Sequence, residues 1–215
     1  MVERFIYFSS ATMKRFPIIQ ADVFAKNVGT PEQRQQLIDE AWAAYNNNDE
    51  TIGFSNRGCW RSYFKYTNIE WLITEIKQLV NEAGFYYQQH DPIYTDKCQS
   101  FGDADISYWT NINQIGSKNA LHDHKLYHYV AVYYLQGTGT GDIIFSNPAN
   151  LNEGCNPYAP FVSPCAFAPN DGDLFVWPAW LPHETEHNHS DRNRINIAFN
   201  IRFQAPQSLF NEKYY

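Results

Sequence analysis

Residues 122–135 read HDHKLYHYVAVYYL, a pair of histidines followed by a run of apolar and aromatic residues. In an extended strand, the side chains at positions i and i+2 point to the same side. His122 and His124 can therefore offer two imidazole nitrogens to one ion at about 2.0–2.2 Å, with Asp123 facing away. The same pair is also compatible with two solvent-exposed histidines in a loop. A third ligand is needed before the pair indicates a metal site.

A second segment, GDLFVWPAWLPHETEHNHSDRNRINIAFNI (172–201), supplies that ligand. Its apolar part WPAWLP (177–182) contains two prolines, which restrict the backbone directly before His183. A histidine fixed in this way, far along the chain, can complete a site begun by His122 and His124. We therefore interpret the three histidines as candidate ligands of one metal ion.

The strand expected at the end of this segment places an arginine beside the candidate site. Side chains alternate along RINIAFNIRF, so that one face carries Arg194, Asn196, Ala198 and Asn200 and the other carries Ile195, Ile197, Phe199 and Ile201. If the apolar face packs beneath helices, Arg194 and Asn196 point into the interior. A buried guanidinium needs a partner, and an organic carboxylate matches its two-pronged donors. The alternative is a surface arginine at a strand end. Together with the three histidines, Arg194 suggests an iron-dependent oxygenase.

The apolar pattern predicts a mostly β fold with flanking helices. From about residue 105 the pattern has a period of two, which favours a sandwich or barrel with strands at 105–113, 125–136, 141–146, 173–178 and 193–203. The helical signals lie in the first hundred residues. Thr30 and Pro31 are suited to begin a helix over 31–46. A second helix is expected from Asn68 to about residue 83, where Gly84 would end it.

Two further segments fit this outline. Residues 55–66 (SNRGCWRSYFKY) indicate a turn or the edge of a strand. Residues 147–171 are rich in proline and asparagine and long for a connection, so we expect a functional loop or an insertion near the rim of a pocket. Aromatic residues make up 17% of the chain, which favours a β-rich core with a lined pocket.

Length and charge limit the classes of protein to which such a site can belong. The 215 residues and 25.0 kDa fit a single domain with a substantial core. The net charge is −7 and no run of Lys or Arg occurs, so no nucleic-acid partner is expected. The four cysteines form no CxxC pair and are expected to be free thiols in a reducing cell. With no basic and apolar leader and no apolar window of about 18 residues, we expect a soluble, cytoplasmic protein without a membrane partner.

Five motifs together resemble one enzyme family. HDHKLYHYVAVYYL, GDLFVWPAWLPHE and RINIAFNI, with WTNINQIG (109–116) and SNRGCWRS (55–62), are similar to the 2-oxoglutarate/Fe(II) oxygenases of bacteria and phages, a branch near the prolyl-hydroxylase-like enzymes. The similarity spans about residues 55–203. It implies a double-stranded β-helix, a cupin-like jelly roll, with N-terminal helices on the outer face of the major sheet. The whole chain, 1–215, would be one oxygenase domain, with a mixed part over 1–100 and a jelly-roll core over 105–203.

The resemblance also implies the roles of individual residues. His122, His124 and His183 would hold Fe(II), and Arg194 would bind the distal carboxylate of 2-oxoglutarate. The reaction would convert 2-oxoglutarate and O₂ to succinate and CO₂ and hydroxylate a substrate, which could be a peptide, a metabolite or a sugar. Two departures stand out. The wider superfamily has a carboxylate where His124 stands, and Cys59 occupies a position where glycine is expected.

Several further residues are candidates on weaker grounds. Asn196, Asn111 and, if no bulge intervenes, Tyr134 could donate hydrogen bonds to the co-substrate or could be ordinary core residues. His128 has the same strand parity as the HxH pair and is expected to be an interior, hydrogen-bonded histidine or a residue that supports a metal ligand. His187 and His189 lie in a polar segment and are expected to be solvated.

Two other classes of protein remain open. A cupin-like enzyme that uses three histidines without 2-oxoglutarate would explain the histidines but would give Arg194 no role. A non-enzymatic jelly-roll module, structural or carbohydrate-binding, would explain the strands and aromatic residues but would leave the histidine spacing a coincidence.

Overall fold

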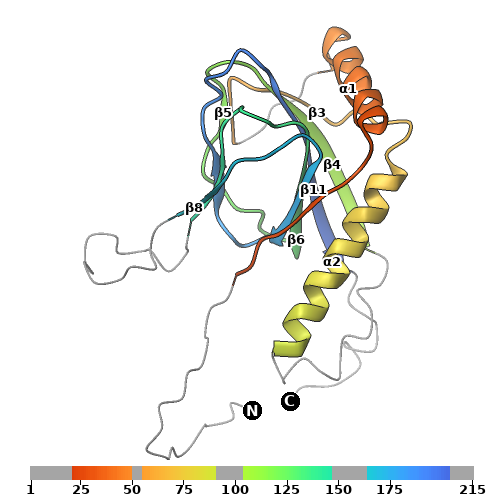
Figure 1. Cartoon of the computed structure of the whole chain (residues 1–215), viewed down its shortest axis with the longest axis vertical. Coiled ribbons are helices and arrows are strands. Elements are labelled where there is room, and N and C mark those ends of the chain that lie inside the picture. The colour runs from red at the N-terminus through yellow and green to blue at the C-terminus, as the bar shows by residue number, and fades with distance from the viewer. Residues whose placement is uncertain (1–20, 50–54, 91–103, 147–163, 204–215) are drawn as a thin grey trace, which may run out of the picture.

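The computed structural model describes residues 21–49, 55–90, 104–146 and 164–203 (Figure 1). Within these residues the chain forms two helices, α1 (Pro31–Asn46) and α2 (Glu70–His90). The strands are β1 (Phe24–Asn27), β2 (Asn56–Arg57), β3 (Trp60–Ser62), β4 (Ala104–Asn113), β5 (Lys118–Asn119), β6 (Tyr129–Gln136), β7 (Ile143–Phe145), β8 (Cys165–Phe167), β9 (Asp173–Pro178), β10 (His183–Thr185) and β11 (Arg194–Phe203).

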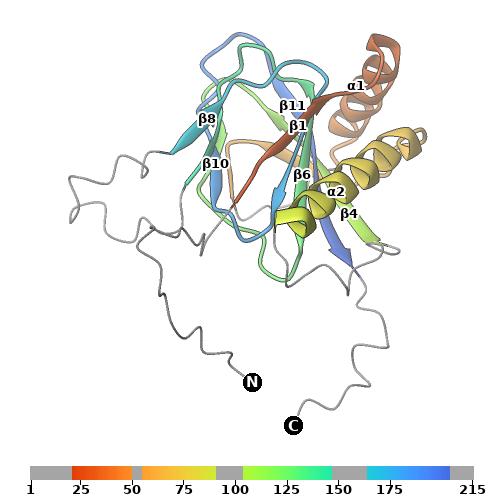
Figure 2. The ribbon, with the colours of Figure 1, turned by 60° about the horizontal axis from the view of Figure 1, so that its bottom comes forward.

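The strands form two opposed layers. The larger is a six-stranded antiparallel sheet in the order β1-β9-β6-β11-β4-β3. The smaller combines the sheet β10-β7-β8 with the pair β2-β5. The backbone N–H of Asn119 in β5 donates to the Thr185 hydroxyl in β10 at 2.9 Å, which joins these two parts. In Figure 2, β8 and β10 lie on the side of the molecule away from α2. The predicted double-stranded β-helix is confirmed.

The outer face of the large sheet packs against both helices. Four residues of β11 lie in this core, namely Ile195, Ile197, Phe199 and Ile201, together with Leu37 and Ala41 of α1 and Leu72, Ile76 and Val80 of α2. The opposite face contributes to a second core between the layers, which includes Val130, Trp177 and Ala198. The prediction that the isoleucine face of β11 packs beneath the helices is therefore confirmed, and the alternate residues of this strand face the interior.

The first helix begins and ends where the sequence predicts. Thr30 accepts a hydrogen bond from the backbone N–H of Gln33, and the Gln33 side chain accepts from the Thr30 backbone N–H. This reciprocal pair is a capping box. The second helix differs from the prediction, because α2 continues through Gly84 to His90. One glycine inside a helix costs only about 1 kcal/mol relative to alanine, which is too little to end it.

The predicted strand 125–136 begins four residues late, at Tyr129. Residues 125 and 126 form a turn, in which Leu126 has a φ of 79° and the Tyr127 N–H donates to the His124 carbonyl at 3.3 Å. His122 and His124 therefore precede the strand instead of lying on it.

The other predicted segments were located with smaller errors. The strand at 173–178 is confirmed, the one at 141–146 is reduced to 143–145, and residues 55–66 contain β2 and β3. Strands β1, β5, β8 and β10 were not predicted. Of the expected loop 147–171, residues 147–163 lie outside the described residues, and β8 occupies 165–167.

Two of the four cysteines lie in the described residues. Cys59 is a buried free thiol and Cys165 an exposed one, whereas Cys98 and Cys155 fall outside this part of the chain. In the same residues, neither helix has an apolar stretch long enough to cross a membrane.

Replacing Ile197 with alanine should destabilise the protein by about 2–5 kcal/mol, because the side chain is fully buried between β11 and the helices. Ile115→Ala is the matched control. Its side chain is 70% exposed, and the expected change is within about 0.5 kcal/mol. Urea unfolding followed by tryptophan fluorescence measures both. Equal losses in the two variants would mean that the helices do not cover this face.

Candidate metal centre

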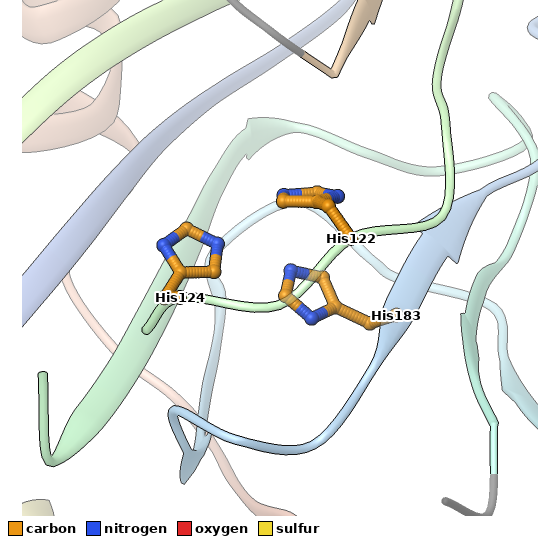
Figure 3. A group of neighbouring side chains, drawn as sticks. All are labelled: His122, His124 and His183. Atoms are coloured by element: carbon orange, nitrogen blue, oxygen red, sulfur yellow. The ribbon is translucent and has the colours of Figure 1, made fainter. Parts of the chain in front are cut away.

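The three histidines singled out in the sequence lie together in the structure (Figure 3). Each can offer one nitrogen to a group in which all three donor atoms lie within 4.8 Å of one another. The ring centroids are 4.4 Å apart for His122 and His183, 5.0 Å for His122 and His124, and 5.1 Å for His124 and His183. Within the described residues, no cysteine or carboxylate belongs to this group.

Backbone hydrogen bonds bring the three residues together. The N–H of His122 donates to the carbonyl of His183 at 3.0 Å, and the N–H of His183 donates back at 2.9 Å. The N–H of His124 donates to the carbonyl of Ala179 at 2.9 Å. The HxH segment is thus held in an extended form beside the turn that leads into β10. This extended backbone produces the same-side placement that the sequence pattern predicted, although the segment is not part of β6.

The outer nitrogen of every ring has a hydrogen-bond partner. Nδ1 of His122 lies 2.7 Å from the Ala120 carbonyl, and Nδ1 of His183 lies 3.0 Å from the Leu181 carbonyl. Nδ1 of His124 lies 2.6 Å from Oδ1 of Asn200. A carbonyl oxygen can only accept, so a neutral imidazole in these positions carries its proton on Nδ1. The lone pair of Nε2 is then left for a metal ion, an arrangement common among metal-binding histidines.

The surroundings keep these rings neutral. Burial lowers the pKa of His122, and burial together with the neighbouring His122 lowers the pKa of His124 to about 4. The pKa of His183 is lowered well below its ordinary value, chiefly by burial. Metal ions bind histidine in its neutral form, not as the protonated imidazolium. The site therefore does not have to lose protons before it takes up a cation at neutral pH.

A cavity lined by both polar and apolar side chains adjoins the histidines. It is lined by all three rings and by Ser55, Trp109, Asn111, Asn119, Val130, Val132, Tyr134, Ile143, Thr185, Asn196 and Ala198. Nδ2 of Asn111 donates to Oδ1 of Asn196 at 2.9 Å, while Oδ1 of Asn111 is buried with no partner among the described residues. An unsatisfied buried amide oxygen carries a cost, so the cavity has a polar position that a ligand could occupy.

Arg194 is fully buried and is not itself among the residues that line the cavity, although it bonds to the lining residue Thr185. Its Nη1 donates to the Thr140 carbonyl at 2.9 Å, and its Nη2 donates to the Thr185 hydroxyl at 2.8 Å and to the Glu186 carbonyl at 3.1 Å. The Nε has no partner within the described residues. The prediction that Arg194 is an interior residue is confirmed, but protein oxygens hold both of its terminal nitrogens.

A glycine allows the chain to pass over this arginine. Gly141 has a φ of 95°, and a Cβ at this position would lie 3.3 Å from Nη1 of Arg194 and 3.1 Å from the His187 carbonyl. Residues that carry a Cβ rarely adopt such a φ, and the space that the Cβ would need is occupied by these two groups.

Some of the remaining candidates lie where the sequence predicted, and one does not. Asn111, Tyr134 and Asn196 all line the cavity. The prediction of an interior His128 is wrong, because its side chain is exposed and its Nδ1 accepts a hydrogen bond from the Phe203 N–H at the end of the strand pair. His187 and His189 are exposed, as expected.

Cys59, the residue that stands where glycine is expected, is buried and has polar partners. Its sulfur accepts a hydrogen bond from Nδ2 of Asn113 at 2.7 Å and donates to the Lys118 carbonyl at 3.1 Å. Burial raises the pKa of this thiol. The thiol thus bonds to residues of β4 and β5, and it is not one of the candidate metal ligands.

Sequence reasoning missed three residues that contact the site. Thr185 lies two residues after His183 and bonds Arg194, so the same i, i+2 argument used for the HxH pair could have found it. Asn200 shares the interior face of β11 with Arg194, but its contact with His124 joins residues distant in the sequence and could not be read from a local pattern. Trp109 stacks on the His124 ring at 5.8 Å and 16°, and no local pattern indicated this contact.

Comparisons with known proteins point to one family. The family described as "Putative 2OG-Fe(II) oxygenase" matches residues 107–200, a span that contains the three histidines, Arg194 and Asn200. No curated protein sequence matches this chain.

Several solved structures share the fold. A prolyl-4-hydroxylase from Pseudomonas putida is 12% identical with a TM-score of 0.59, over 85% of this chain and 93% of that one. A prolyl hydroxylase from Trichoplax adhaerens, in complex with a hypoxia inducible factor peptide fragment, is 12% identical with a TM-score of 0.58, over 89% and 87%. The carbocyclase SnoK from nogalamycin biosynthesis is 12% identical with a TM-score of 0.59, over 83% and 78%. Identities this low establish the fold alone.

Anaerobic calorimetric titration with Fe(II) should give one binding site per chain, and His183→Ala should weaken binding at least about 100-fold, since one of three nitrogen donors is lost. His187→Ala is the control, because that ring is exposed and outside the cluster. Wild-type affinity in the His183 variant would contradict the assignment of the centre.

Proposed function

We propose that the protein is a 2-oxoglutarate- and Fe(II)-dependent oxygenase that hydroxylates a substrate, because residues 107–200 match the family described as "Putative 2OG-Fe(II) oxygenase". The observation that carries the proposal is the convergence of His122, His124 and His183 at the wall of a cavity with a mixed polar and apolar lining, with Arg194 buried nearby and bonded to the lining residue Thr185. The family supplies the reaction class, and the arrangement of this chain's own side chains supplies the roles described below.

The donor set fits a first-row transition metal ion. Imidazole nitrogens suit iron, and three donors on one side leave positions on the other side for co-substrate and O₂. The three donor nitrogens lie within 4.8 Å of one another. Small rotations of the rings would bring each nitrogen to about 2.0–2.2 Å from one shared ion, the distance typical of metal–imidazole bonds. The iron and 2-oxoglutarate, when bound, would supply the oxidising chemistry, in which O₂ and 2-oxoglutarate give succinate, CO₂ and one oxygen atom for the substrate.

The ligand set differs in charge from the two-histidine, one-carboxylate arrangement common in such enzymes. Three neutral imidazoles leave the full charge of a divalent ion uncompensated. Arg194 adds a further positive charge close to the cavity. A dianion such as 2-oxoglutarate matches this positive charge. Its two carboxylates supply the negative charge that a protein carboxylate would supply in a two-histidine, one-carboxylate site.

Arg194, Thr185 and Tyr134 would bind the distal carboxylate of the co-substrate. Thr185 and Tyr134 line the cavity, and Thr185 is bonded to the arginine. Burial raises the pKa of Tyr134 to about 12, while the charge of Arg194 acts in the opposite direction. The phenol therefore stays protonated at neutral pH and can donate its hydrogen to a carboxylate. The Arg194 Nε, with no partner among the described residues, is a further donor.

Asn111 and Asn196 would position the co-substrate from the floor of the cavity. An amide can present either its oxygen or its NH₂ group, and a half-turn of the side chain exchanges the two. If both amides turn, their mutual hydrogen bond is kept and Nδ2 of Asn111 faces the cavity. That group can then donate to a carboxylate oxygen.

The apolar side of the cavity would exclude water from the reacting atoms. Val130, Val132, Ile143 and Ala198 all face it from the interior of the sandwich. Electrostatic contacts are stronger where water is excluded. These aliphatic side chains would thus strengthen the hold of the metal and of Arg194 on an anionic co-substrate.

One observation favours a second candidate, a three-histidine metalloenzyme that does not use 2-oxoglutarate. The terminal nitrogens of Arg194 are bonded to Thr140, Thr185 and Glu186, which joins β11 to the segment before β7 and to the end of β10. An arginine held in this way could serve the fold alone. The two candidates differ in whether 2-oxoglutarate binds.

Incubation with Fe(II), 2-oxoglutarate, ascorbate and O₂ should form succinate, slowly even without a primary substrate. Arg194→Ala should raise the Kd for 2-oxoglutarate by about 10–100-fold, the value of a charge-assisted hydrogen bond, and should leave Fe(II) affinity within about twofold. Arg192→Ala is the control, because its side chain is 43% exposed and pairs with Asp171. Succinate is measured by chromatography and binding by anaerobic calorimetry.

The opposite results separate the candidates. Fe(II) binding without any binding of 2-oxoglutarate would favour the second candidate. Loss of Fe(II) and co-substrate together in the Arg194 variant would assign the arginine to the fold.

A further inference from the structure

We propose that Asn200 is a positioning residue for His124, the histidine that stands where related sites carry a carboxylate, and that its side chain sets how strongly this ligand holds the metal. The inference rests on the metal site of the proposed function, but it does not depend on 2-oxoglutarate or on the identity of the substrate. Asn200 touches no reacting atom, since it contacts the outer edge of the His124 ring at 2.6 Å.

The three ligands are held in two different ways. His122 and His183 each bond, through Nδ1, to a main-chain carbonyl two residues earlier, at Ala120 and Leu181. Substitution of a side chain cannot remove a main-chain carbonyl. His124 instead bonds to a side chain on another strand. It is therefore the ligand whose orientation depends on the chemistry of a single distant residue.

The His124 ring is held on its face as well as at its edge. Trp109 of β4 stacks on it with centroids 5.8 Å apart and planes 16° apart. Stacking restricts the tilt of the ring but leaves rotation within its own plane open. The bond to Asn200 restricts that rotation, so the two contacts together aim Nε2 toward the other ligands.

The amide also selects the tautomer. With Oδ1 facing the ring, Nδ1 must carry the proton and Nε2 is free to bind a metal. With Nδ2 facing the ring, the proton would move to Nε2 and block the site. Metal binding therefore requires the orientation seen in the structure. A carboxylate in place of the amide can only accept, and it would make the imidazole more basic.

The position of Asn200 follows from the strand that carries it. Asn200 lies on the face of β11 that also carries Arg194 and Asn196, and its partners across the sheet are Val130 of β6 and Ser107 of β4. Because strand pairing on both sides fixes this register, a side chain at position 200 is aimed at the HxH segment. One strand thus supplies the proposed carboxylate anchor and the support for the third ligand.

Titration of the apo-protein with Co(II), followed by its visible absorption, tests the inference without any turnover. Asn200→Ala should lower Co(II) affinity by about 10–100-fold, the usual effect of losing an outer hydrogen bond to a ligand histidine, and should change the band shape. Asn200→Asp should restore wild-type or tighter binding, because a carboxylate accepts the same bond. Ser107→Ala, at the paired position on β4 and exposed, should match the wild type.

The outcomes separate this inference from the proposed function. If the wild type fails to bind Co(II), the metal site itself is contradicted. If the wild type binds and Asn200→Ala binds equally well with the same spectrum, Asn200 has no positioning role. Thermal unfolding of the apo-forms controls for folding. Should Asn200→Ala fail to fold, Asn200→Asp decides alone, since a folded variant that binds Co(II) 10-fold or more weakly than the wild type overturns the inference.

Discussion

The site depends on one short backbone contact, the pair of hydrogen bonds between His122 and His183. It joins the end of the segment after β5 to the start of β10, two parts of the chain that are far apart in sequence. Once this pair forms, two imidazoles face one another at 4.4 Å between centroids. The extended backbone then carries His124 to the same side. The convergence of the three histidines is thus a consequence of strand pairing in the smaller layer.

The division of the large sheet into two faces provides the rest of the site. One face is covered by α1 and α2, so its alternate residues are apolar and determine the packing of the helices. The other face is closed off by the smaller layer, where most buried polar groups need a hydrogen-bond partner. The terminal nitrogens of Arg194 and the side chains of Asn196 and Asn200 have such partners on other elements, whereas Nε of Arg194 and Oδ1 of Asn111 have none within the described residues. A single strand therefore links the stability of the fold to the chemistry of the cavity.

Part of the fold and of the candidate site could be predicted from the sequence, where the prediction depended only on local strand geometry. The period-two pattern of 194–203 depends only on strand geometry, and it correctly placed Arg194 and Asn196 inside. The WPAWLP segment indicated His183 as a third candidate ligand, but the position of this histidine beside His122 depends on a backbone pair between distant residues. Features that depend on contacts between distant residues were not predictable. The turn at Leu126 interrupts an apparently continuous apolar run, His128 lies at an exposed strand end despite its parity, and the partners of Arg194 and His124 come from other elements.

The most direct test of the central claim is a crystal structure of the protein grown anaerobically with Fe(II). We expect one ion within about 2.0–2.3 Å of Nε2 of His122, His124 and His183, with no carboxylate of the described residues among its ligands. An ion held by only two of these histidines, or one bound through Asp123 while the His124 ring is turned away, would contradict this claim.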